Sequence, residues 1–385
     1  MSGLALPGAD RRSRIDRLAL TEFRNHAALE LESGGRSMAL AGENGAGKTN
    51  ILEALSFLSP GKGLRRAAPE EIARRGTGKG WAVFAEAQGA LGPVGIGVGT
   101  EEPGADAPRR VRINGAAAKS GEDLLGHLRL LWLTPAMDGL FGGPAAERRR
   151  FFDRLVLAID PQHGRRVGDF EKAMRARNRL LAEGRPDPAW LDAIEAQMAQ
   201  TGIAIVLARA ELVQVLGRVI LEEARDADAF PDAVISTAGT LETLAGDMPA
   251  GDLEERYAAM LAAGRRIDAA AGRTLEGPHR CDFPVLHRKK NMPAALCSTG
   301  EQKALLIGIM LAQASLTRRV CGLAPVLLLD EIAAHLDIGR RAALFDRIEA
   351  LGCQAWMTGA DAALFSALGE RAQHVRIGPD GRGQG

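Results

Sequence analysis

The sequence carries the two halves of one phosphate-binding site near opposite ends of a 385-residue chain. Residues 42–49 match the pattern G-x-x-x-x-G-K-[ST] and lie between an apolar run, Met38 to Ala41, and a helix-like run, Asn50 to Leu58. This order of strand, loop and helix is the context in which the pattern binds phosphate. The second half is an apolar strand that ends in Asp330 and Glu331. Because both halves serve one site, the fold must bring the two ends of the chain together.

The loop predicts how a nucleotide is held. Its glycines allow backbone conformations that bring amide groups close to phosphate oxygens, and the following helix adds the positive end of its dipole. Lys48 should reach the β- and γ-phosphates. We expect the whole loop to contact the nucleotide: Gly42, Glu43, Asn44, Gly45, Ala46, Gly47, Lys48 and Thr49. The alternative is a chance match to the pattern, which the flanking strand and helix disfavour.

Two carboxylates follow the second apolar strand, and their chemistry complements the loop. Asp330 can hold a magnesium ion through water, and the hydroxyl of Thr49 is expected to be a ligand of the same ion. Glu331 can orient or deprotonate an attacking water, so we assign the catalytic roles to Glu331 and Lys48. The alternative is a strand end at which two carboxylates simply meet solvent. The phosphate-binding loop favours the metal-binding interpretation.

Residues 298–301, Ser-Thr-Gly-Glu, form a capping-box pattern at the start of an apolar helix. Ser298 should cap the helix, and Glu301 should reach back to the backbone of Ser298. Taken alone, the pattern favours a well-capped helix and no more. Its small, polar, glycine-bearing start also suits an anion, which makes Ser298, Thr299 and Gly300 candidate phosphate contacts.

The spacing of apolar residues predicts an α/β head with an inserted, mostly helical lobe. Residues 15–144 show strand patterns around one buried helix, and residues 273–385 return to alternating strand and helix signals. Residues 145–272 show helical spacing. Residues 1–14 are expected to be a flexible extension. The two flanking segments should form one nucleotide-binding head, because they share the nucleotide.

The composition indicates a globular protein without a global attraction to polyanions. Lys and Arg number 49 against 48 Asp and Glu, a formal net charge of +1, so any binding of nucleic acid or anionic lipid must depend on local patches. Four widely spaced cysteines indicate free thiols in a reducing cytoplasm. The apolar run from Ala304 to Leu316 is too short to cross a bilayer, and no membrane partner is expected.

The order of the motifs resembles the ABC-type ATPase heads of chromosome-maintenance proteins. The phosphate-binding loop and helical insertion are followed by Ser-Thr-Gly-Glu-Gln-Lys and then by Asp-Glu-Ile-Ala-Ala-His-Leu-Asp at residues 330–337. Within that class the chain resembles the RecF family of bacterial DNA replication and repair proteins. Its most specific matches are Glu-Arg-Arg-Arg-Phe-Phe-Asp at residues 147–153 and Gly-Pro-His-Arg at residues 277–280. The matching stretches run from about residue 15 to about residue 377.

The resemblance implies an ATP-dependent switch on DNA. In such heads the serine-containing helix of one subunit closes on the γ-phosphate held by the other, which assigns Ser298, Thr299 and Gly300 to the ATP of a second chain. The implied states are an ATP-bound homodimer on gapped DNA or single/double-strand junctions, and its release by slow hydrolysis in a weak ATPase. The implied setting is recombinase loading with recombination-mediator proteins, replication and the SOS response. The alternatives are an ABC transporter ATPase subunit and a P-loop small-molecule kinase.

Two positions depart from the pattern of these families. RecF-like chains usually continue Gly-Pro-His-Arg with two aspartates, whereas this chain has Cys281 followed by Asp282. In the wider ABC class a histidine often follows the last core strand and contacts the γ-phosphate. Residues 357–361 fill that place here, and Thr358 is a candidate for a weaker hydrogen bond.

Several groups of basic residues have an open role. Residues 148–150, three consecutive arginines, are expected to form a solvated helix face or, alternatively, an intersubunit or phosphate contact. Four further patches together offer a face for nucleic-acid phosphates. They are Arg65–Arg66, Arg74–Arg75, Arg109–Arg112 and Arg288–Lys290.

Overall fold

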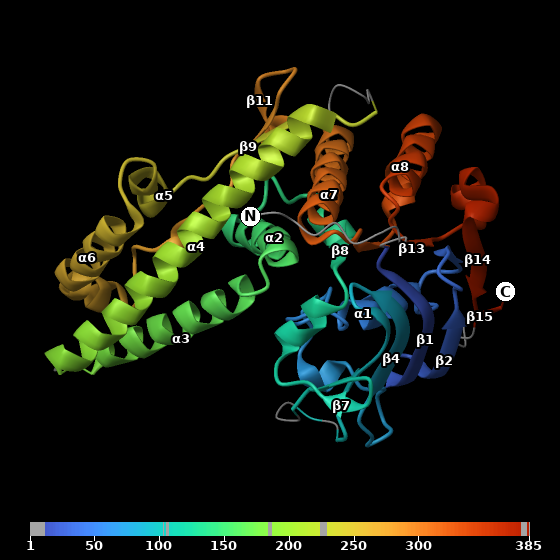
Figure 1. The fold of residues 1–385 in the computed structure, drawn as a ribbon, viewed down its shortest axis with the longest axis horizontal. Coiled ribbons are helices and arrows are strands. Elements are labelled where there is room, and N and C mark those ends of the chain that lie inside the picture. The colour runs from blue at the N-terminus through green and yellow to red at the C-terminus, as the bar shows by residue number, and fades with distance from the viewer. Residues whose placement is uncertain are drawn as a thin grey trace. The chain divides into compact units, whose positions relative to one another are not determined.

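The structure is a computed structural model that describes residues 12–102, 104, 108–183, 187–223, 229–378 and 383–384. Its contacts divide the chain into two compact units (Figure 1). One comprises the chain up to Pro135 and from Ala314 onward, and the other comprises Ala136–Gln313. The first unit contains both halves of the predicted site, which confirms an α/β head assembled from both chain ends. The domain boundaries predicted at residues 144/145 and 272/273 stay predictions.

The core of the first unit is a sheet in the order β15-β14-β3-β13-β12-β8. Strand β3 leads into the phosphate-binding loop and pairs in parallel with β13 and β14, while β13 also pairs with β12. Strand β13 therefore lies between the loop strand and the strand that ends in Asp330. Apolar runs such as β12 suit parallel strands covered on both faces. The strands are β3 (Ser37–Ala41), β8 (Leu130–Leu133), β12 (Val326–Leu329), β13 (Ala355–Gly359), β14 (Ala372–Ile377) and β15 (Gly383–Gln384).

A second sheet of the same unit is antiparallel, in the order β2-β1-β4-β5-β6-β7. Its first two strands form a hairpin in which Phe23 pairs with His26, so residues 24 and 25 make a two-residue turn. Alternating burial along these strands gives the sheet one face toward the core. The strands are β1 (Arg14–Phe23), β2 (His26–Glu32), β4 (Ala82–Gly89), β5 (Gly92–Gly99), β6 (Arg110–Ile113) and β7 (Ala116–Ala117).

Two α-helices lie wholly in the first unit. Helix α1 (Lys48–Ser56) follows the loop and packs against β12 and β13, and α8 (Ile338–Ala350) packs against a 3₁₀ segment after β13. Asp337 caps α8 by accepting a hydrogen bond from the Arg340 backbone N–H. The 3₁₀ segments are η1 (Pro69–Glu71), η2 (Gly121–Gly126), η6 (Ile332–His335) and η7 (Ala362–Arg371), and η3 (Pro135–Met137) spans the boundary between the units.

The second unit is mostly helical. Helices α3, α4 and α6 pack along one another (Figure 1), around a core that includes Phe170, Met198, Val206 and Tyr257. A small sheet in the order β11-β10-β9 accompanies them. The helices are α2 (Ala145–Ile159), α3 (His163–Ala182), α4 (Pro188–Glu223), α5 (Thr240–Ala245) and α6 (Ala250–Ala271). The shorter elements are β9 (Ala233–Ile235), β10 (Val285–His287), β11 (Met292–Pro293), η4 (Pro278–Arg280) and η5 (Ala294–Leu296).

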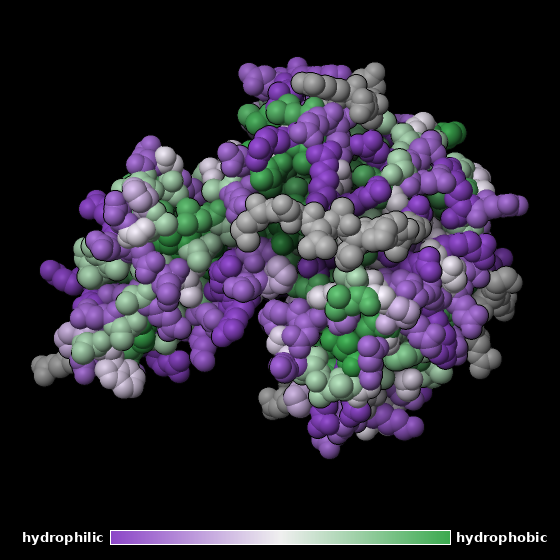
Figure 2. Space-filling model, viewed as in Figure 1, coloured by the Kyte–Doolittle hydropathy of each residue, from purple (hydrophilic) through white to green (hydrophobic). Residues whose placement is uncertain are grey.

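Helix α7 (Thr299–Cys321) runs from the second unit into the first. Within the described ranges it is the one helix long and apolar enough to cross a membrane, and 72% of its most apolar window is buried inside the protein. Such burial is typical of a core helix. On the face of the molecule in Figure 2, hydrophilic side chains dominate and hydrophobic residues form separate patches.

The predicted N-terminal extension is only partly described, because residues 1–11 lie outside the described residues. Arg12 forms a bridge with Ala324, and β1 begins at Arg14. The last residues of that segment are therefore attached to the head.

A buried charge network ties the helices of the second unit together. The Arg177 side chain is fully buried and donates hydrogen bonds to Glu195 at 2.8 Å, to Asp268 at 2.6 Å and to the Leu261 carbonyl at 2.7 Å. The three partners come from α4 and α6, whereas Arg177 comes from α3. Removal of Arg177 takes the paired cation away from the buried Asp268, while Glu195 keeps its ion pair with Arg265.

We expect Arg177→Ala to lower the free energy of unfolding by about 3–5 kcal/mol, as breaking a buried ion pair typically does. Urea denaturation followed by circular dichroism measures the change. The matched control is Arg175→Ala on the same helix, whose side chain is 64% exposed in an ion pair with Glu171. That change should cost less than about 1 kcal/mol, and equal losses in the two variants would contradict the role assigned to the network.

Candidate nucleotide site

The phosphate-binding loop turns from β3 into α1 with the backbone that its glycines allow. Gly45 and Gly47 have φ angles of 87° and 100°, in the left-handed region that side chains disfavour. At Gly42 an added Cβ would lie 2.4 Å from the Ile377 carbonyl oxygen of β14, so only glycine permits this approach. Gly47 is the N-terminal cap residue of α1, which places the helix dipole at the loop.

Lys48 lies folded back over the loop. Its side-chain ammonium donates to the carbonyl oxygens of Gly42 at 2.7 Å and Glu43 at 2.9 Å, and it lies 3.8 Å from the Glu331 carboxylate. The residue is 4% exposed. The ammonium therefore sits inside the curve of the loop, where it can exchange these neighbours for phosphate oxygens.

A chain of short hydrogen bonds joins the two halves of the site. The Thr49 hydroxyl donates to Asp330 Oδ1 at 2.8 Å, although the two residues are 281 positions apart in the sequence. The Thr358 hydroxyl donates to the same oxygen at 2.8 Å and accepts from the Glu331 backbone N–H at 3.0 Å. Asp330 is 5% exposed. The predicted magnesium residues, Thr49 and Asp330, are thus brought together with both predicted catalytic residues.

The turn of the β1–β2 hairpin braces the loop, and the sequence did not predict this. The Asn25 side-chain amide donates to the Ala46 carbonyl at 3.2 Å, and His26 Nε2 lies 3.2 Å from the Gly47 carbonyl oxygen. Asn50, on α1, donates to Asn25 at 2.7 Å. An added Cβ at Gly47 would lie 2.5 Å from the Asn25 side chain. The polar residues at positions 24–26, directly after β1, were the available signal in the sequence. Which groups they contact depends on how the antiparallel sheet packs beside the loop.

Arginines from two segments surround a buried glutamate on α1. Glu53 is fully buried and accepts from Arg24 through both of its oxygens, at 2.6 and 2.8 Å. Arg65 donates to Glu53 at 3.2 Å and to Asn50 at 2.5 Å. Two cations around one carboxylate leave a surplus positive charge beside the first turn of α1, which favours an anionic ligand there.

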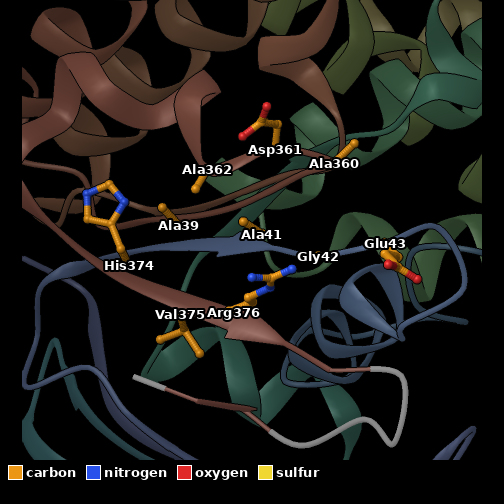
Figure 3. Close-up of a pocket in the computed structure, with 10 residues that line it drawn as sticks. All are labelled: Ala39, Ala41, Gly42, Glu43, Ala360, Asp361, Ala362, His374, Val375 and Arg376. Atoms are coloured by element: carbon orange, nitrogen blue, oxygen red, sulfur yellow. The ribbon is translucent and has the colours of Figure 1, made fainter.

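A cavity of about 340 Å³ opens beside the start of the loop (Figure 3). The small side chains of Ala39 and Ala41 leave it open. In this view the Arg376 side chain lies between those of His374 and Glu43. Asp361 and Arg376 lie on opposite sides of Ala39 and Ala41 of β3. The cavity therefore presents both signs of charge next to Gly42 and adjoins the candidate site at the start of the loop.

The predicted capping box is confirmed at the start of α7. The Ser298 backbone N–H and hydroxyl both lie 3.1 Å from one carboxylate oxygen of Glu301, and the Glu301 N–H donates back to the Ser298 hydroxyl at 3.4 Å. Lys290 pairs with Glu301. The hydrogen bond from Lys290 has the largest effect on the pKa of Glu301 and, together with the hydrogen bonds from Ser298, lowers it to about 2. Ser298, Thr299 and Gly300 are exposed and belong to the second unit, whereas Lys48 belongs to the first.

The expectation of a solvated face at residues 148–150 is wrong for two of the three arginines. Arg148 binds both carboxylate oxygens of Asp282, at 2.7 and 2.9 Å, and Arg149 donates to the Cys281 carbonyl at 2.6 Å. Arg150 is half-exposed and pairs with Glu147. The arginines point to the segment after Gly-Pro-His-Arg because α2 packs beside it, which spacing alone does not reveal. The Cys281 thiol is buried, and burial raises its pKa to about 12.

Comparisons with known proteins agree with this architecture. The family model described as RecF/RecN/SMC N terminal domain matches residues 14–378. A protein of Rhizobium meliloti (strain 1021) named DNA replication and repair protein RecF is 58% identical over 363 residues, covering 94% of this chain and 96% of that protein. The protein of the same name from Agrobacterium fabrum is 58% identical over 368 residues, covering 95% and 97%.

Solved structures show the same fold. A structure described as the recombination mediator protein RecF-ATP in the RecFOR pathway matches with a TM-score of 0.85 at 20% identity, covering 98% of both chains. A Pyrococcus furiosus Smc head domain with an extended coiled coil matches with a TM-score of 0.54 at 16% identity, covering 97% of this chain and 95% of that one. The predicted ATPase-head fold is therefore confirmed.

Proposed function

Because this chain belongs to the RecF family, we propose that it is an ATP-switched DNA-binding protein of recombinational repair. The observation that carries the proposal is the Thr49–Asp330 hydrogen bond of 2.8 Å, which joins the phosphate-binding loop to the acidic strand in one site. The relatives are named DNA replication and repair proteins, and one solved neighbour is described as bound to ATP. ATP is accordingly the nucleotide that we assign to Gly42–Thr49.

The oxygens of Thr49 and Asp330 fit a magnesium ion, which prefers hard oxygen ligands and shares its coordination with substrate phosphates. A bound ion would neutralise charge on the transferred phosphate. Lys48 binds and orients the phosphates from inside the loop. Glu331, whose side chain is 25% exposed and 3.8 Å from Lys48, accepts the proton of the attacking water.

The proposed ATP-bound state is a homodimer. Ser298, Thr299 and Gly300 of one chain cover the γ-phosphate held by the other, so two ATP molecules become part of the interface. Exposed apolar side chains next to two of the motifs support this assignment. Leu296, two residues before Ser298, is 71% exposed, and Ile338, after the acidic strand, is 80% exposed. Burying them in a dimer interface removes apolar surface from water.

The proposed partner is the phosphate backbone of DNA. Because the net charge of the chain is only +1, DNA binding depends on local basic patches. The contacts of each arginine narrow the set of candidate DNA-binding residues. Arg109 donates to the carbonyl oxygens of Phe57, Ser59 and Gly61, and burial lowers its pKa to about 10. Arg74 pairs with Glu22. The exposed residues that fit the role better are Arg66, Arg75, Arg112 and Arg288.

Within this proposal the protein works in the cytoplasm at gapped DNA or single/double-strand junctions. It helps recombinase loading together with recombination-mediator proteins, supports replication and the SOS response, and leaves DNA after slow hydrolysis. Family membership and the fit of the site to a nucleotide support these roles. They disfavour the alternatives of a transporter ATPase and a small-molecule kinase.

The test is DNA binding with and without ATP, wild type against Lys48→Arg. We expect ATP to strengthen binding of the wild type to a gapped duplex by about tenfold or more, a coupling of the usual allosteric size. A guanidinium at this position cannot replace a compact ammonium inside the loop, so the variant should lose this gain. Fluorescence anisotropy with labelled duplex, gapped and single-stranded DNA measures it. If the wild type binds none of the labelled DNAs at any ATP concentration, the transporter or kinase alternative is favoured.

A further inference from the structure

Thr358 occupies a special place in the head because it lies on the strand between the two halves of the nucleotide site. Strand β13 pairs with β3 on one side and with β12 on the other. Thr358 is the next-to-last residue of β13 and is paired with Leu40 of β3. Its side chain is fully buried, so the hydroxyl meets protein groups rather than solvent.

The single hydroxyl of Thr358 serves two residues of the site. It donates to Asp330 Oδ1 at 2.8 Å and accepts from the Glu331 backbone N–H at 3.0 Å. A hydroxyl has one proton to donate. Because that proton goes to Asp330, the expectation of a Thr358 hydrogen bond to the γ-phosphate is not supported by the structure.

We propose that Thr358 is a positioning residue that fixes the Asp330 carboxylate for magnesium and the Glu331 side chain for the attacking water. This inference rests on the proposed ATP-binding function and assigns the residue a role in that site. It concerns a group behind the acidic residues, not one that touches the nucleotide.

The first part of the role concerns the carboxylate. Thr49 and Thr358 both donate to Oδ1 of Asp330, at 2.8 Å each. Two donors on one oxygen restrict rotation of the carboxylate and leave Oδ2 as the oxygen to face the magnesium shell. When Thr49 turns toward the metal, Thr358 remains to hold the carboxylate. Groups that orient metal ligands in this way commonly change metal affinity or activity by 10- to 100-fold.

The second part concerns the backbone of Glu331. Its φ angle is 52°, in the left-handed region that is unfavourable for a residue with a side chain. The Thr358 hydroxyl accepts from its N–H and so stabilises this conformation. The conformation directs the chain into η6 just after the strand ends. Loss of the hydroxyl would leave the N–H unpaired and free Glu331 to relax away from Lys48.

The experiment compares Thr358→Val and Thr358→Ser in the full chain. Valine keeps the shape but removes both hydrogen bonds, whereas serine keeps the hydroxyl. The readout is the affinity for a fluorescent ATP analogue with excess EDTA and then with Mg²⁺, followed by turnover. In EDTA, we expect the wild type and both variants to bind the ATP analogue with about the same affinity. The increase in affinity that Mg²⁺ produces should be about tenfold smaller in Thr358→Val than in the wild type. Turnover of that variant should fall by about 10- to 100-fold, and Thr358→Ser should restore both quantities.

The outcomes separate this inference from the proposed function. If Thr358→Val keeps the full gain from Mg²⁺ and wild-type turnover, the positioning role is overturned while the ATP site stands. If the wild type itself binds no nucleotide with or without Mg²⁺, the ATP-binding proposal fails, and this inference fails with it. Should Thr358→Val melt at a much lower temperature, Thr358→Cys replaces it. A thiol is a weaker hydrogen-bond donor than a hydroxyl, so both the gain from Mg²⁺ and the turnover of Thr358→Cys should fall below those of the wild type without being lost completely. Wild-type values of both quantities would overturn the role.

Discussion

Replacement of Lys48 by alanine should weaken ATP binding by about 100-fold. The side chain is 4% exposed and its ammonium lies within 3 Å of two loop carbonyls. Charged hydrogen bonds of this kind contribute up to about 3 kcal/mol, which corresponds to about two powers of ten in a dissociation constant. Isothermal titration calorimetry with ATP and Mg²⁺ measures the loss directly.

The matched control is Lys62→Ala, because Lys62 is an exposed lysine shortly after α1. Its removal should change ATP affinity by less than about twofold, as expected for a solvated surface charge. Circular dichroism separates a binding defect from unfolding. If Lys48→Ala binds ATP within threefold of the wild type, the loop is not the nucleotide site and the assignment of Gly42–Thr49 is wrong.

Replacement of Glu331 by glutamine should trap an ATP-dependent dimer. The amide keeps the size of the side chain but cannot accept a proton, so turnover should fall by about 10²- to 10⁴-fold, the usual contribution of a general base. ATP affinity should stay within about threefold, because Lys48 and the loop are unchanged. Light scattering coupled to gel filtration, with ATP and Mg²⁺ present, measures the mass of the trapped species.

A second substitution tests whether the signature residues make that dimer. Inside the chain an added Cβ at Gly300 meets nothing within 4 Å, so Gly300→Asp should fold normally. In the proposed interface its carboxylate would face the γ-phosphate of the partner. The double variant, Glu331→Gln with Gly300→Asp, should therefore run as a monomer with ATP. If Glu331→Gln alone stays a monomer with ATP, the proposed ATP-dependent dimerisation is wrong. If the double variant still forms a dimer, the interface does not involve Gly300.

Much of the head follows from local patterns. The glycines and Lys48-Thr49 predict a strand–loop–helix, and the apolar run before Asp330 predicts a buried strand. Since one phosphate site needs both segments, the sequence also predicts that the two chain ends share one sheet. The capping box at Ser298 is a local feature of the same kind, because its partners are three residues apart.

Contacts that depend on how the sheets and helices pack were not predictable in this way. Arg148 and Arg149 belong to a run of arginines typical of a solvated helix face, yet they bind the segment at residues 281–282. Arg109 belongs to a basic patch in the sequence but satisfies loop carbonyls in the structure. The same arginine can be a solvated charge or a buried donor, and only its neighbours in space decide which.

By itself, then, the sequence determined the phosphate-binding loop and the two carboxylates, because each depends on residue type at fixed short spacing. It also determined the joining of the chain ends, because one phosphate site needs both segments. Only the tertiary structure decided what surrounds them. It placed Asn25 and His26 against the loop, and it turned Thr358 from a candidate phosphate contact into a buried partner of Asp330 and Glu331. The physical reason is the order of strands: β13 lies between β3 and β12, so a hydroxyl at its end meets the acidic strand before it can meet the nucleotide.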